Sequence, residues 1–147
     1  MFEKRIEIRW SDVDAYRHVN NAVYATYLEE CRDEWTELIL GADGDLWGFV
    51  LARVAIDFRR ELTLEDDAVL VTCRPVSVGN SSITTREEVR TLDGELSAEA
   101  EAVLVARDSD TGRSRPLTER EREAFEHALL QAEPDKSAND SPSSGKA

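Results

Sequence analysis

The sequence predicts an α+β fold in which an antiparallel sheet of about five strands wraps around one long central helix. Three observations predict it: residues 21–40 carry apolar side chains at helical spacing, five other segments alternate with the period of strands, and no helix separates the last four of these. Strands joined in this way pair antiparallel and leave one apolar face. The long helix is expected to cover that face, and a short helix follows near the C-terminus.

The first strand is expected at residues 2–10 and the long helix at residues 21–40. In the strand, one face would carry Phe2, Ile6, Ile8 and Trp10. Asn20 or Asn21 can cap the helix, because a side-chain carbonyl accepts a hydrogen bond from an unpaired amide of the first turn. Gly41 supplies the stop.

Four strands are expected between the two helices. The second strand would place on one face Val50, Ala52, Val54, Ile56 and Phe58. The third, at 69–78, changes phase at Pro75, as a bulge would cause. Segments 83–92 and 96–106 form a hairpin around Asp93-Gly94, a strong turn dipeptide.

The remaining residues predict a short helix and a tail. Thr118 and Glu121 have the spacing of a capping box that opens a helix to about Leu130. We expect one domain at 1–130, and a disordered tail at 131–147, which has no large apolar side chain. A single small sheet leaves an edge that a second copy of the chain could continue, which favours a homodimer.

Composition excludes several classes of partner. With 18 basic and 31 acidic residues the net charge is −13, so nucleic acid and anionic membrane surfaces are expected to be repelled. No apolar run spans a bilayer and the charged N-terminus does not resemble a secretory signal, so a cytoplasmic location is expected. Cys31 and Cys73 are expected to be free core thiols; no metal site and no phosphate-loop, dinucleotide-binding or serine-hydrolase motif is present.

Residues 10–21 are unusually polar for the entrance to a buried helix. A helix N-terminus presents unpaired N–H groups that can stabilise an oxyanion, and Asp14 or Asp12 could supply a base or nucleophile beside it. The alternative is that these side chains only cap the helix and shape the turn. His18 fits either a brace for the loop or a proton-transfer group.

The string D-x-D-A-x-x-H-V-N-N-x-x-Y, followed by Glu29-Glu30-Cys31-Arg32, resembles the hydroxybenzoyl-coenzyme A thioesterase family of the hotdog fold, with a looser match over residues 54–67. That resemblance implies that Asp14 is the catalytic carboxylate, as nucleophile or as general base for water. It also implies that the N–H near Asn21 polarises the thioester carbonyl. Asp12, His18 and Asn20 would shape the pocket, at a site on a dimer interface.

The resemblance also suggests substrate contacts elsewhere. Tyr24 is a candidate for contact with the acyl group, although side chains at the spacing of Tyr24, Tyr27 and Leu28 are more often part of the core. Ser81 and Ser82 open the fourth strand, where relatives place polar residues toward the partner's site. Arginine suits phosphate groups, and the candidates for those of coenzyme A are Arg53, Arg59, Arg60 and Arg74.

These observations together predict a homodimeric or homotetrameric acyl-coenzyme A thioesterase that needs no cofactor, because coenzyme A is part of its substrate. An acyl-carrier-protein thioester is the other candidate substrate. Three alternatives remain at this stage: a non-catalytic binder of acyl thioesters or apolar ligands, a hotdog dehydratase, and a purely structural dimerisation domain.

Overall fold

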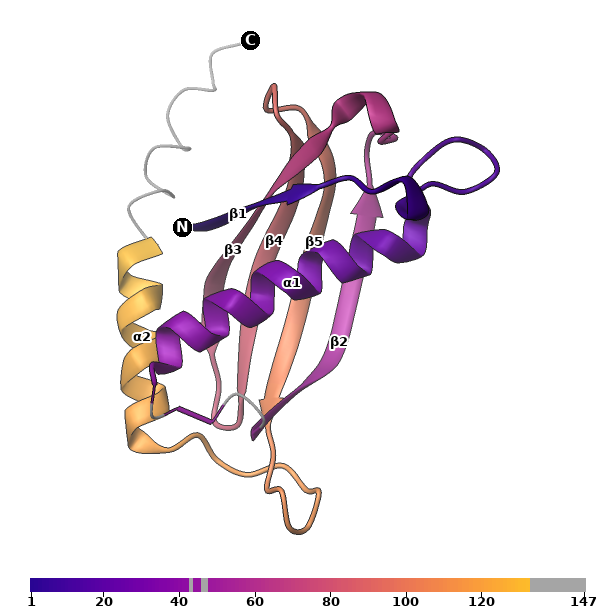
Figure 1. Ribbon diagram of the computed structural model, residues 1–147. Coiled ribbons are helices and arrows are strands. Elements are labelled where there is room, and N and C mark those ends of the chain that lie inside the picture. Colours follow the sequence, from indigo (N-terminus) through magenta and orange to yellow (C-terminus); the bar gives the residue numbers. More distant parts are fainter. Residues whose placement is uncertain (43, 46–47, 133–147) are drawn as a thin grey trace, which may run out of the picture.

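The computed structural model describes residues 1–42, 44–45 and 48–132, and these form one antiparallel sheet with two helices. The elements are β1 (Phe2–Glu7), α1 (Asn21–Leu40), β2 (Phe49–Phe58), β3 (Ala68–Val78), β4 (Ser82–Thr91), β5 (Leu96–Ala106) and α2 (Glu119–Ala132), with short 3₁₀ turns η1 (Trp10–Asp12) and η3 (Leu64–Asp66). The strand order is β1-β3-β4-β5-β2, and α1 lies across one face of the curved sheet (Figure 1). This confirms the predicted fold class and element order.

The core lies between α1 and the concave face of the sheet. Residues spaced three or four apart on α1 point into it, which is why this segment forms one amphipathic helix. The most deeply buried of them are Tyr24, Tyr27, Leu28, Cys31 and Trp35. The sheet contributes alternate residues of β3, β4 and β5, and most of those from β5 are alanines.

The C-terminal helix corrects one expectation, because α1 does not cover the sheet alone. α2 lies against β3, and its fully buried Phe125 packs against Trp35 of α1 with tilted rings and edge-on against Phe49 of β2. The predicted capping box is confirmed: the Glu121 carboxylate accepts from the Thr118 N–H at 2.9 Å, and the Glu121 N–H donates to the Thr118 hydroxyl at 3.1 Å.

The helix α2 continues to Ala132, two residues beyond the expected boundary at Leu130. Residues 133–147 of the predicted tail lie outside the described residues. In the part of the chain that is described, neither helix is long and apolar enough to cross a membrane.

The strand β2 differs from its predicted alternation. A bulge between Leu51 and Arg53 adds one residue, so Leu51 and Val50 exchange faces relative to the prediction. The face toward α1 carries Phe49, Leu51, Val54, Ile56 and Phe58. Because β2 is an edge strand, Leu51, Val54 and Phe58 remain 43%, 36% and 46% exposed.

The first strand is shorter than expected. β1 ends at Glu7, and Trp10 lies in η1 with 82% of its surface exposed, so its predicted place on the buried face is wrong. A 3₁₀ turn has no period-2 alternation, so the face assignment fails where the strand stops. The bulge after Pro75 and the hairpin around Asp93-Gly94 are both confirmed.

A buried ion pair fixes the middle of α1 to the sheet. The Arg32 guanidinium donates to both carboxylate oxygens of Glu87 on β4, at 2.8 and 2.9 Å, and the two residues are 3% and 1% exposed. The Thr85 hydroxyl donates to the same carboxylate at 2.7 Å. This geometry sets the position of α1 along the sheet, and therefore the position of its N-terminus.

Candidate active site

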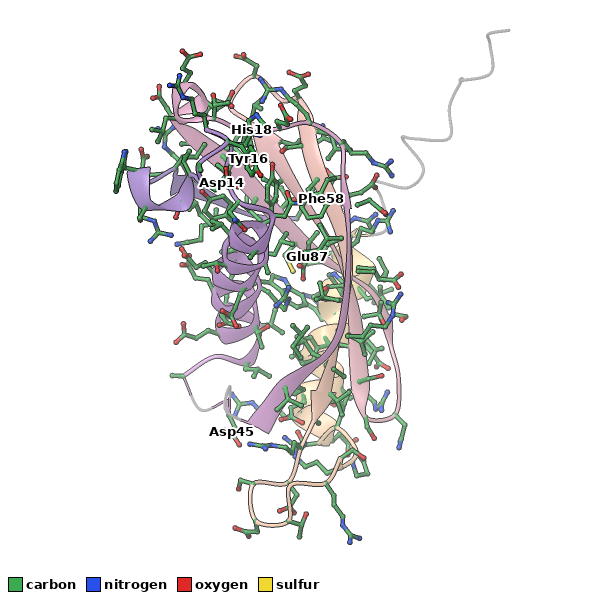
Figure 2. All side chains as sticks on the ribbon, turned by 90° about the vertical axis from the view of Figure 1, so that its right-hand side faces the viewer. Asp14, Tyr16, His18, Asp45, Phe58 and Glu87 are labelled. Atoms are coloured by element: carbon green, nitrogen blue, oxygen red, sulfur yellow. The ribbon has the colours of Figure 1, made fainter. Side chains whose placement is uncertain are left out.

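A cleft of about 610 Å³ opens at the N-terminal end of α1. It lies between the loop that precedes the helix and the end of β2, and Figure 2 shows Asp14, Tyr16 and His18 gathered at this end of the molecule with Phe58 facing them from β2. Its lining residues are Asp14, Tyr16, His18, Val19, Asn20, Asn21, Tyr24, Phe58, Arg59, Arg60 and Glu61.

The loop of residues 13–19 is closed on itself by backbone hydrogen bonds. Val13 and Val19 form an antiparallel bridge, and the Asp14 N–H donates to the His18 carbonyl at 3.0 Å. The Arg17 N–H donates back to the Asp14 carbonyl at 2.9 Å, and Arg17 adopts a φ of +70°, in the left-handed region that a tight reversal requires. The polar loop predicted from sequence is therefore compact.

The Asp14 carboxylate is held by two donors of the same loop. One oxygen accepts from the Tyr16 N–H at 2.9 Å, and the other lies 3.5 Å from the Asn20 side-chain nitrogen. Asn20 is also the helix cap, because its side-chain oxygen accepts from the Ala22 N–H at 2.8 Å. One side chain therefore links the carboxylate to the first turn of α1.

Asn21 is the first residue of α1 and lines the cleft. Among the described residues, its backbone N–H has no hydrogen-bond partner. Such an N–H at a helix start carries part of the positive end of the helix dipole. The cleft thus combines a carboxylate with a donor suited to a negatively charged oxygen.

The opposite wall of the cleft is fixed by Tyr24. Its hydroxyl lies 3.0 Å from the Ser97 hydroxyl and 3.3 Å from the Arg60 carbonyl, and the Ser97 hydroxyl donates to the same carbonyl at 2.7 Å. The Phe58 ring packs edge-on against Tyr24 at 5.1 Å. Burial raises the pKa of Tyr24, so the hydroxyl stays neutral and serves as an anchor.

His18 reaches across the cleft. Its Nε2 lies 3.3 Å from a carboxylate oxygen of Glu61, and both residues line the opening. Beneath this contact the Val19 N–H donates to the Leu62 carbonyl at 2.8 Å, so the loop is also joined to the segment after β2 through the backbone. This arrangement matches the brace that was one of the two interpretations of His18.

Three of the four arginines expected to bind phosphate already pair with carboxylates. Arg59 pairs with Glu99 at 2.8 Å, and Arg60 pairs with Asp66 at 3.2 Å and with Glu95 at 3.0 Å. Both lie at the rim of the cleft. Two further candidates lie elsewhere, since Arg53 pairs with Glu101 and lines a separate hollow, and Arg74 lines a hollow beside the C-terminal end of α1.

Two other predicted site residues do not line the cleft. Asp12 is 6% exposed and its carboxylate accepts hydrogen bonds from Arg9 and Tyr27. Ser82 lies at the start of β4. Phe58 pairs with Ala98 of β5, and Ala98 pairs with Val89 near the other end of β4, so Ser82 is at the end of the sheet away from the cleft. Neither is in contact with the cleft of its own chain.

Sequence reasoning missed several residues that the fold brings to the cleft. Tyr16, Phe58 and Glu61 line it, and Ser97 anchors its wall from β5. Ser97 alternates with the alanines of β5 and is buried because the register of β5 shifts beside it, so the sequence pattern gave no signal for it. No group of three or more metal-binding side chains lies together in the part of the chain that the structure describes.

Comparison with known proteins adds evidence independent of this geometry. The family profile of the thioesterase-like superfamily matches residues 8–130. The long-chain acyl-CoA thioesterase FadM of Escherichia coli is 28% identical over 133 residues, covering 86% of this chain and 98% of that protein.

Two solved structures of similar proteins are also described as thioesterases. A thioesterase from Thermus thermophilus, crystallised in complex with coenzyme A and Zn, is 33% identical with a TM-score of 0.78, covering 88% of this chain and 94% of the other. A predicted thioesterase from Bacillus stearothermophilus is 26% identical with a TM-score of 0.79, covering 87% and 96%.

Proposed function

Because this chain belongs to the thioesterase-like superfamily and is a thioester hydrolase with the hotdog fold, we propose that it hydrolyses acyl-coenzyme A in the cleft at the start of α1. The observation that supports the proposal is that one cleft is lined by Asp14 and by Asn21, whose backbone N–H has no hydrogen-bond partner among the residues that the structure describes. A metal or redox cofactor has no part in this proposal.

The Asn21 N–H would polarise the thioester carbonyl. As a nucleophile adds to the carbonyl carbon, negative charge develops on the oxygen, and a preorganised donor at a helix start stabilises that charge more than the ground state. The backbone supplies this donor, so the Asn21 side chain is not required for it. Asn20 holds the first turn in place by capping it.

Asp14 would start the chemistry by one of two routes. As general base it takes a proton from water, hydroxide adds to the carbonyl carbon, and the C–S bond breaks to release the thiol after protonation of sulfur. As nucleophile its oxygen forms an acyl anhydride with loss of the thiolate, and water then cleaves the anhydride. The weaker of its two contacts, at 3.5 Å from Asn20, leaves one oxygen open to either role.

The substrate would be bound at both ends of the cleft. Tyr24 and Phe58 offer an apolar wall for the acyl group, while Arg59 and Arg60 stand at the rim. A phosphate of coenzyme A would exchange with the surface carboxylates that these arginines now hold, and such exposed pairs contribute little by themselves. FadM acts on long-chain acyl-CoA and the Thermus relative binds coenzyme A, which supports this substrate class.

We also propose that the working unit is at least a dimer formed along β2. This edge strand carries unpaired backbone groups and exposes Leu51, Val54 and Phe58, a combination that a second copy would bury by continuing the sheet. Phe58 also lines the cleft, so such an interface would border the site. Light scattering of the full chain reports its mass in solution directly.

The test is release of free thiol from a panel of acyl-coenzyme A substrates, comparing the wild type with Asp14→Asn. The substitution keeps the shape of the side chain and removes its basicity, and we expect a fall in kcat of at least about a hundredfold. The matched control is Asp110→Asn, which removes one exposed carboxylate from the loop after β5, away from the residues that line the cleft. Its rate should equal that of the wild type.

Ellman's reagent is suited to this assay because the protein's own thiols are hidden. Cys31 and Cys73 are 1% and 0% exposed, and burial raises the pKa of Cys31 to about 12 and that of Cys73 well above its usual value. The signal therefore comes from the substrate. Equal rates for wild type and Asp14→Asn would remove Asp14 from the mechanism.

A further inference from the structure

Asp12 lies two residues before Asp14 but serves a different part of the structure. Its carboxylate is nearly buried and one of its oxygens accepts three hydrogen bonds: from the Arg9 N–H at 2.9 Å, the Tyr27 hydroxyl at 2.7 Å and the Arg9 Nε at 3.4 Å. The contact with Arg9 closes the turn η1. The contact with Tyr27 does something more, because it joins the loop to the second turn of α1.

The same residue holds the other end of the loop through its backbone. The Asp12 carbonyl accepts from the Asn20 N–H at 3.0 Å, directly beneath the Val13–Val19 bridge. The loop is closed on itself by these hydrogen bonds, and its position relative to α1 depends on where Asp12 and Asn20 are held, together with the bond from the Val19 N–H to the Leu62 carbonyl. Tyr27 fixes Asp12, and Asn20 caps the helix.

The Tyr27–Asp12 contact is built to persist. Tyr27 is completely buried, and burial together with the neighbouring Asp12 charge raises the pKa of its hydroxyl far above the ordinary value. Burial also opposes ionisation of Asp12, but hydrogen bonds from Arg9 and Tyr27 outweigh it and lower the pKa of this carboxyl. A neutral phenol therefore donates to an ionised carboxylate, which is a strong hydrogen bond.

We propose that Asp12 and Tyr27 are a pair of positioning residues that hold the Asp14 loop against the first turn of α1, so that Asp14 and the Asn21 N–H face the same thioester. The pair touches neither the cleft nor a substrate in it, and acts only through Asp14. This inference rests on the proposed role of Asp14. Misplacement of a reacting group by about 1 Å costs on the order of a hundredfold in rate.

The test is Tyr27→Phe, which removes one oxygen and leaves the buried ring in place. We expect kcat to fall at least about tenfold while KM changes less than about twofold, because substrate contacts are intact. The control is Thr36→Val, which removes another buried hydroxyl from α1; the Thr36 hydroxyl donates to the Arg32 carbonyl at 2.8 Å, away from the cleft. The Thr36→Val protein should lose about as much stability as Tyr27→Phe and keep the wild-type kcat.

A double-mutant cycle separates positioning from general destabilisation. If Tyr27 acts through Asp14, adding Tyr27→Phe to Asp14→Asn lowers the residual rate no further, whereas a merely structural effect lowers it in both backgrounds. Asp12→Asn tests the same hydrogen bond from the other side, since the amide oxygen is a weaker acceptor, and it should lower kcat in the same direction. If Tyr27→Phe does not fold, Asp12→Asn still tests the proposal.

The outcomes are distinguishable. A low rate for Asp14→Asn together with a kcat for Tyr27→Phe equal to that of Thr36→Val overturns the positioning pair and leaves the proposed function standing. Additive losses in the cycle overturn it as well. A wild-type rate for Asp14→Asn overturns both proposals, and a fall in kcat for Tyr27→Phe that disappears without Asp14 supports both.

Discussion

Replacing Arg32 by Met should expose the energetic importance of the ion pair beneath α1. The substitution removes both charged donors from Glu87 and leaves its carboxylate, 1% exposed, with the Thr85 hydroxyl and a distant Cys73 thiol. Breaking a buried pair from one side costs about 3–5 kcal/mol, because an uncompensated charge stays in the interior. For a chain of this size we expect the Tm to fall by about 10–15 °C.

Removing the second partner should recover most of this loss. In Arg32→Met/Glu87→Leu no charge remains between α1 and β4, and two apolar side chains fill the space, so we expect stability within about 2 kcal/mol of the wild type. The hydroxyl of Thr85 loses its acceptor, which accounts for about 1 kcal/mol of the remaining difference.

Urea unfolding, followed by circular dichroism and by the fluorescence of buried Trp35, measures all three proteins. The reasoning fails if Arg32→Met is within about 1 kcal/mol of the wild type, since the carboxylate would then be solvated or neutralised at little cost. It also fails if the double variant is no more stable than the single one.

Two further changes test the site and the second helix. Asn20→Ala removes the cap of α1, so it should lower the free energy of unfolding by about 1 kcal/mol and lower kcat. Asn20→Ser restores the cap but does not reach Asp14, so the stability in urea should recover while the rate of thiol release stays low. A wild-type rate for both variants would contradict this. Glu121→Gln should destabilise the protein by about 1–3 kcal/mol near neutral pH. Although burial opposes ionisation, Arg115 and the Thr118 N–H lower the pKa of Glu121, so its stabilisation is complete above its ordinary pKa and is lost as pH falls through the lowered value. Urea midpoints of wild type and Glu121→Gln should therefore converge in acid, and a constant difference at every pH would refute the assignment.

Much of the fold could be predicted because it depends on neighbours in the chain. The α1 periodicity, the hairpin at Asp93-Gly94 and the capping box of Thr118 and Glu121 each follow from residues within a few positions of one another. The predictions failed where one residue interrupts a pattern. The bulge beside Leu51 reversed the faces at the start of β2, and the 3₁₀ turn at Trp10 ended the alternation of β1.

The candidate site was predicted in part. The polar segment before α1 placed Asp14, His18, Asn20 and Asn21 together, and the structure brings all four to one cleft. Residue type and spacing did not distinguish Asp12 from Asp14, two carboxylates separated by one residue, and only the family resemblance implied that Asp14 is the catalytic one. The structure places them in different surroundings, because Tyr27 and Arg9 donate to Asp12 whereas Asp14 lines the cleft.

Local sequence patterns alone were therefore enough to place the strands, the long helix and the polar segment before it, since side-chain periodicity and capping act over a few residues. The pairs that shape the site join residues far apart: Tyr24 with Ser97, Arg32 with Glu87, and the His18 loop with the segment after β2. Such pairs exist only after the sheet has curved around α1. Packing of the helix on the sheet decides which polar groups, distant in the sequence, are buried together, and buried polar groups must then form hydrogen bonds with one another.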